Sequence, residues 1–113
     1  MFSEDAREEM EHELDAAWSA RRSGLEGRAR VCARRAAGVA LREYCKSHQI
    51  PAPSSAIDLL RTVDALPGLP ERVKGIAVHL LERVDVEFHL SSGVDLLEET
   101  RELINLINEM EKG

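Results

Sequence analysis

The residues best suited to chemistry are the arginines between positions 21 and 46. This stretch carries eight basic and two acidic residues, a net charge of +6. Arginine presents a planar fork of N–H donors that matches phosphate and carboxylate groups. The block therefore predicts either a phosphate site or pairing with acidic side chains. Its basic members are Arg21, Arg22, Arg28, Arg30, Arg34, Arg35, Arg42 and Lys46.

Helical periodicity sorts five of these arginines into two rows. Residues seven positions apart lie on one face of a helix, so Arg28, Arg35 and Arg42 form the first row. Arg30 and Arg34 form a second row, about 120–140° around the helix from the first. All five are candidate residues for binding a phosphate-bearing ligand.

Small side chains lie between the two rows. Val31, Gly38 and Cys45 are again seven residues apart and predict a narrow groove rimmed by guanidinium groups. Such a face suits contact with a helix of a second copy or of a partner. In the last predicted helix, Leu106 and Met110 widen the apolar stripe beyond what one neighbour needs. These five residues are the candidate homodimer interface.

Three interpretations of the arginine block stay open. The arginines could pair with residues 1–20, whose net charge is −6, contact another chain, or bind phosphate or RNA. The whole chain has a net charge of −6, which lowers its general affinity for nucleic acid. Its few aromatic residues also provide no stacking platform of the kind that single-stranded RNA modules use. They are Phe2, Trp18, Tyr44 and Phe88.

A second group with chemical potential is the stripe of Arg72, His79 and Arg83 on one flank of a predicted helix. A cation beside a histidine keeps the imidazole neutral and able to act as a base. The alternative is an ordinary polar flank. A single Glu-x-x-His pair, Glu9 and His12, lacks the second copy that a di-iron bundle needs, so we expect no metal and no cofactor.

These residues must be positioned by helices, because every long stretch carries the 3.6-residue period. Ser3 and Ser54 are the predicted N-caps of the first and third helices. The pattern predicts one domain over residues 1–113, an all-α up-and-down bundle of four main helices with one additional short helix. The five helices are expected at 4–22, 25–47, 55–65, 70–84 and 92–111.

The stretch 84–90 alternates with period two, as a strand does. We interpret it as an extended connector, with strand pairing to a second copy as the alternative, because a lone strand is not stable. Cys32 and Cys45 lie about 20 Å apart on one helix, too far for a disulfide, which fits a reducing compartment. No apolar run approaches a membrane span and no signal peptide is evident, so we expect a cytoplasmic protein.

The second predicted helix resembles the long, alanine-rich central helix of HEPN-type domains. The resemblance rests on GLEGRARVCARRAAG, from Gly24 to Gly38, on ALREY, from Ala40 to Tyr44, and on helix order over nearly the whole chain. It implies a four-helix bundle, homodimerisation, and a role in binding nucleotide or RNA. Some members of that family are ribonucleases, and many pair with a minimal nucleotidyltransferase as a toxin–antitoxin-like unit.

The catalytic motif of that family is an arginine, four to six residues, and a histidine, commonly with a polar residue directly after the arginine. All four histidines of the chain satisfy this spacing, and we expect Arg83 and His89 to carry any metal-independent ribonuclease activity. Valine follows both Arg72 and Arg83, which departs from the motif. The favoured function is thus a non-catalytic, self-associating binding and assembly module, with a nucleotidyltransferase-type partner or RNA as candidate ligands. The alternatives are a ribonuclease toxin and a plain protein-interaction scaffold.

Overall fold

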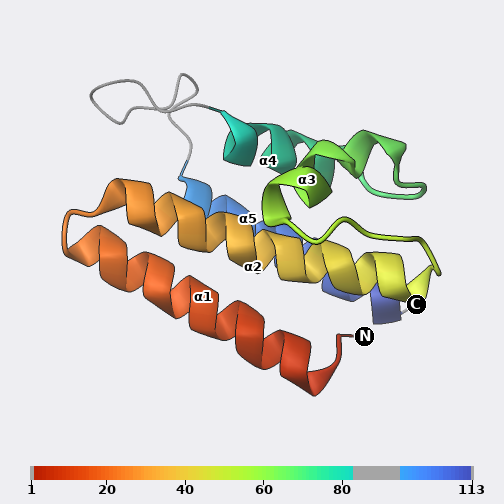
Figure 1. Cartoon of the computed structure of the whole chain (residues 1–113), viewed down its shortest axis with the longest axis horizontal. Coiled ribbons are helices and arrows are strands. Elements are labelled where there is room, and N and C mark those ends of the chain that lie inside the picture. The colour runs from red at the N-terminus through yellow and green to blue at the C-terminus, as the bar shows by residue number, and fades with distance from the viewer. Residues whose placement is uncertain (1, 83–94, 113) are drawn as a thin grey trace.

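The computed structural model describes residues 2–82 and 95–112, and within these residues it contains helices and no strand. Four main helices and a short fifth one, with a 3₁₀ turn, confirm the predicted all-α fold (Figure 1). None of the described helices is long and apolar enough to cross a membrane. The elements are α1 (Glu4–Arg22), α2 (Glu26–Ser47), α3 (Ala56–Arg61), η1 (Val63–Ala65), α4 (Glu71–Leu81) and α5 (Leu96–Lys112).

Helix α2 is the centre of the bundle. It contacts α1, α3, α4 and α5, and Figure 1 shows it lying between α1 and α3 with α5 behind it. Its buried positions are dominated by alanine, and these small side chains allow neighbouring helices to approach closely. The buried alanines of α2 are Ala29, Ala33, Ala36, Ala37 and Ala40.

Local signals set the helix ends. The hydroxyl of Ser3 accepts the N–H of Ala6 at 3.1 Å, which confirms the predicted cap of α1. Beyond the other end, Gly24 takes a φ of +77°, which glycine tolerates without steric cost, and the chain turns back into α2. The predicted cap of α3 was wrong by one residue. The cap is Ser55, whose hydroxyl accepts the N–H of Asp58 at 3.0 Å, and not Ser54.

The core lies between α2 and the apolar faces of α1, α4 and α5. Tyr44 is its largest fully buried side chain, and its hydroxyl donates to the carbonyl of Pro67 in the link between η1 and α4. This hydrogen bond ties that link to the central helix. Large residues that the other helices bury fully include Met10, Leu14, Ile76, Leu80, Leu97, Leu103 and Ile107.

The start of α5 is fixed by Asp95. Its Oδ1 accepts the N–H of Leu97 at 3.0 Å, the N–H of Glu98 at 3.3 Å, and Nη1 of Arg21 on α1 at 2.8 Å. Burial opposes ionisation of this carboxyl, but the bonds from Arg21 and Glu98 outweigh it and hold the pKa of Asp95 below its ordinary value. One carboxylate therefore caps α5 and joins it to α1.

We expect Asp95→Ala to lower the free energy of unfolding by about 1 kcal/mol at pH 7, the usual value of an N-cap. Because the folded-state pKa is depressed, this contribution is complete above the unfolded-state pKa of about 3.9. It is lost as pH falls through the lower folded-state pKa. Urea unfolding of both proteins at about pH 7 and at about pH 2.5 checks this. A stability difference that does not shrink in acid would contradict it.

Candidate functional site

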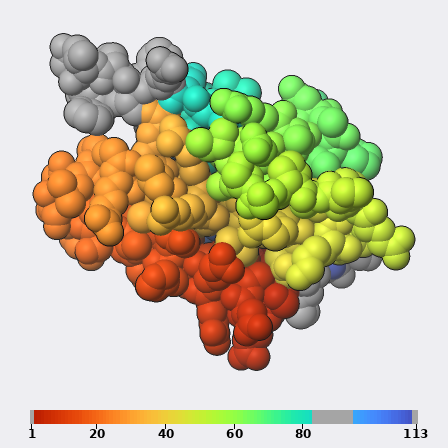
Figure 2. All heavy atoms as spheres, in the orientation of Figure 1, coloured from red at the N-terminus to blue at the C-terminus, as the bar shows by residue number. Residues whose placement is uncertain are grey.

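The first arginine row runs along the outer face of α2. Figure 2 shows this helix exposed between α1 and α3. Arg28 and Arg35 are exposed, whereas Arg42 is half-buried and its Nη2 donates to the carbonyl of Ser54 at 3.0 Å. Among the described residues, neither Arg28 nor Arg35 takes part in an ion pair. Two of the three predicted row members therefore have guanidinium groups that no charged side chain of the described ranges, 2–82 and 95–112, pairs with.

The second arginine row points towards α4. Arg30 is only 6% exposed, and Arg34 is half-buried with its Nε donating to the carbonyl of Leu80 at 2.7 Å. Burial lowers the pKa of both guanidinium groups. The sequence predicted two rows flanking an open groove, but this row is covered because the end of α4 packs beside it.

The groove between the rows is filled by the chain itself. Val31 is 39% exposed, but Gly38 and Cys45 are buried. A Cβ atom built on Gly38 would lie 2.8 Å from Cβ and 3.1 Å from Cα of Ala56, the first residue of α3. Helix α3 therefore packs closely against α2 where the side chains of α2 are small. Only the Val31 end of the expected groove is on the surface.

The remaining candidate interface residues and the two cysteines are partly or wholly internal. Leu106 and Met110 of α5 are partly buried and pack against the core of the same chain. Cys32 and Cys45 are buried free thiols, and burial raises the pKa of each. A raised pKa keeps a thiol protonated and unreactive, so neither cysteine has the character of a nucleophile.

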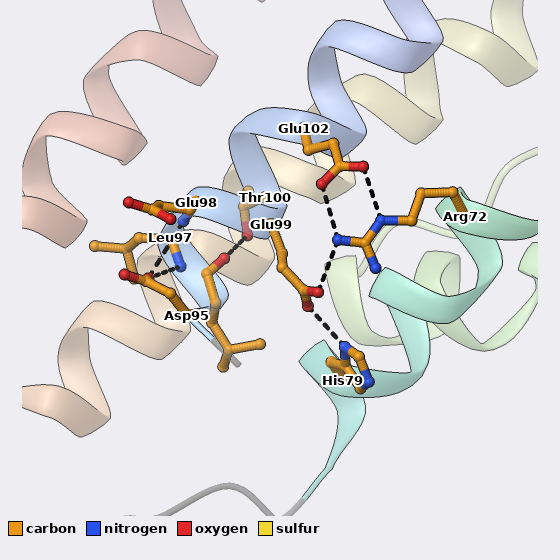
Figure 3. A network of polar contacts seen from close by, with 9 residues as sticks. Arg72, His79, Asp95, Leu97, Glu98, Glu99, Thr100 and Glu102 are labelled. Atoms are coloured by element: carbon orange, nitrogen blue, oxygen red, sulfur yellow. Dashed lines mark hydrogen bonds and ion pairs between the residues drawn. The ribbon is translucent and has the colours of Figure 1, made fainter. Parts of the chain in front are cut away.

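A polar cluster joins α4 to α5 (Figure 3). Nε and Nη2 of Arg72 donate to the two carboxylate oxygens of Glu102 at 2.7 and 2.8 Å, and Nη2 also reaches Oε2 of Glu99 at 3.0 Å. The other oxygen of Glu99 lies 2.6 Å from Nδ1 of His79. The hydrogen bonds that Arg72 donates to Glu102 and then to Glu99 raise the pKa of Arg72, and Arg72 lowers the pKa of Glu102.

Sequence spacing had identified Arg72 and His79 as residues of one flank, and the structure brings both onto Glu99. The two glutamates were missed. They stand three positions apart in α5, at the border of its apolar stripe, as Arg72 and His79 stand seven apart at the border of α4. The sequence signal that could have identified the two glutamates is a basic flank beside the apolar stripe of α4 and an acidic flank beside the apolar stripe of α5.

The charges of this cluster determine what it can do. Glu99 orients the imidazole of His79, as a carboxylate does in a catalytic dyad. However, the guanidinium of Arg72 is already shared by two carboxylates, so the cluster attracts no phosphate of its own. The arrangement therefore acts as a clasp that holds α4 on α5, and we call it the α4–α5 clasp.

The chain matches no family model, no curated protein and no solved structure in the three comparisons made.

The ribonuclease pair expected from the family resemblance, Arg83 and His89, lies outside the described residues. The described part of the chain contains no group of three or more histidine, cysteine, aspartate or glutamate side chains able to hold a metal ion. What the described surface offers is the free arginine face of α2, beside the acidic helix α1.

Proposed function

We propose that this chain is a non-catalytic, HEPN-like helical binding and assembly module that associates with a second copy of itself through α1 and α2. The observation that carries the proposal is the exposed face formed by Arg28, Val31 and Arg35 on the central helix. It places two guanidinium groups and one apolar side chain at the surface, without an ion pair from the described residues.

Helix α1 supplies the complementary charge beside this face. The pKa of the buried Cys32 thiol is raised by burial and by Glu13 of α1, while Arg35 and Arg28 act on it in the opposite sense. Glu13 of α1 and the two arginines of α2 therefore all lie near enough to this thiol at the α1–α2 seam to act on its pKa. The acidic residues that α1 exposes are Glu4, Asp5, Glu8, Glu9, Glu11 and Asp15.

An acidic helix alongside a basic helix makes a self-complementary surface. In a two-fold dimer the same patch meets itself, so α1 of one copy faces α2 of the other. The arginines of each copy then meet glutamates of its partner, and Val31 lies near the centre of the contact. Such charges add modest energy individually, but they select the partner and fix the register.

The opposite charges of α1 and α2 also rank the other candidate ligands. A nucleic-acid backbone approaching Arg28 and Arg35 would also meet the acids of α1, which repel it. A nucleotidyltransferase-type partner remains compatible with the surface if it presents acidic side chains to α2. Self-association needs neither a further molecule nor a further assumption about charge, and we therefore favour it.

Sedimentation equilibrium of the wild type and of Arg35→Glu tests this proposal. We expect the reversal to raise the dimer dissociation constant by at least about tenfold, because it sets like charges against each other in the contact. Added salt should weaken the wild-type dimer, because the pairs are exposed to solvent.

Arg61→Glu is the matched control. It makes the same charge change at an exposed position of α3, outside the Arg28–Val31–Arg35 face, and should leave the dissociation constant unchanged. Thermal unfolding followed by circular dichroism will establish that each variant is folded. A wild type that stays monomeric at all concentrations, or an Arg35→Glu protein that dimerises as the wild type does, would refute the proposal.

A further inference from the structure

Arg30 is a buried cation whose hydrogen bonds are unsatisfied by the described chain. The residue is 6% exposed, and its Nε and Nη2 atoms have no hydrogen-bond partner among the described residues. Arginine stays protonated in proteins, so this side chain does not escape the cost of burial by becoming neutral. A buried charged group without a partner is costly, and native structures seldom contain one.

A second guanidinium lies next to it. Arg34 lies one helical turn further along α2, and its Nε donates a hydrogen bond to the carbonyl of Leu80. Burial lowers the pKa of Arg30 most, the charge of Arg34 lowers it further, and Glu82 acts in the opposite sense. Two cations therefore stand close together, with one carboxylate acting on Arg30 from a distance.

We propose that Arg30 and Arg34 bind a phosphate group, as the free dianion or as a phosphate monoester, at the junction of α2 with the end of α4. A dianion would supply acceptors for Nε and Nη2 of Arg30 and would balance the charge of both arginines. The arginine fork matches phosphate geometry, which favours this ligand over a single carboxylate. The site differs from the Arg28–Val31–Arg35 face, so it does not depend on self-association.

Thermal unfolding at fixed ionic strength tests the site, with inorganic phosphate or adenosine monophosphate replacing chloride. We expect the Tm of the wild type to rise by about 5 °C at roughly ten times the dissociation constant of the ligand. Arg30→Met should abolish the rise. Arg61→Met, at an exposed position of α3 outside both this site and the Arg28–Val31–Arg35 face, should retain it. A response to inorganic phosphate alone identifies free phosphate as the ligand, and a stronger response to the nucleotide identifies a monoester.

The ligand-free protein gives an independent readout. If Arg30 lacks a partner, Arg30→Met removes an uncompensated buried charge and should raise the Tm in phosphate-free buffer. A lower Tm for this variant would show that the chain itself already pairs with Arg30, and would overturn the proposal. So would a wild-type Tm that does not respond to either phosphate compound.

Discussion

Glu99→Ala is expected to lower the free energy of unfolding by about 2 kcal/mol. Glu99 is 7% exposed and holds His79 with one carboxylate oxygen and Arg72 with the other. Its removal leaves the imidazole without its acceptor and opens the α4–α5 clasp. The loss stays below that of a fully buried ion pair because Arg72 keeps Glu102 and is half-exposed.

Urea unfolding of Glu99→Ala and of Glu98→Ala makes the matched comparison. Glu98 is the preceding residue of α5, and its side chain is exposed. Its truncation should change stability by no more than about 0.5 kcal/mol. Equal losses in the two variants would mean that the clasp contributes nothing specific to the packing of α4 on α5.

Gly38→Ala is the second change with a large expected effect, again about 2 kcal/mol of lost stability. The added Cβ would stand 2.8 Å from Cβ and 3.1 Å from Cα of Ala56, so the start of α3 must move away from α2. The contact includes a backbone atom, which cannot rotate aside as a flexible side chain can. The clash therefore outweighs the gain of about 1 kcal/mol that alanine brings to a helix interior.

Gly75 of α4 provides the control, because a Cβ atom built there meets no atom within 4 Å. Gly75→Ala should raise the free energy of unfolding by about 0.5–1 kcal/mol, since only the helix-propensity gain applies. The two alanine substitutions should thus shift the urea midpoint in opposite directions. A stabilising Gly38→Ala would show that α3 does not seat on Gly38 in solution.

The helices were predictable from the sequence because their signals are local. The 3.6-residue period, the serine cap at Ser3 and the glycine turn at Gly24 each act within a few residues. The ends were less accurate. The third predicted helix, 55–65, is interrupted at Thr62, whose hydroxyl bonds back to the carbonyl of Leu59 before η1 begins.

The candidate site was predictable only in part, because burial depends on which element packs where. Arg28 and Arg30 look equivalent in the sequence, but one is exposed and the other is buried beside the end of α4. Similarly, the small face of Gly38 was predicted to meet a helix of a second copy or of a partner, but the helix that approaches it is α3 of the same chain. No local sequence pattern tells which helix will pack against a given face of α2.

One interpretation of the arginine rows was that they pair with the acidic first helix. Among the described residues no ion pair joins either row to α1, although a charged pair does connect α1 with α5 through Glu11 and Arg101 at 2.6 Å. The ion pair that does join α1 to α2, between Arg21 and Glu26 at 3.0 Å, involves neither arginine row. In the proposed dimer, the exposed acids of α1 and the exposed arginines of α2 pair between the two copies.

Mixing two complementary variants tests self-association most directly. One carries Asp5→Lys and Glu9→Lys, at exposed positions one helical turn apart on α1, and the other carries Arg28→Glu and Arg35→Glu on α2. Each alone sets like charges against each other in the two-fold contact, so sedimentation should find both monomeric. Mixed in equal amounts they restore opposite charges on both sides and should form a heterodimer. A mixture that stays monomeric while the wild type dimerises would contradict an α1–α2 interface.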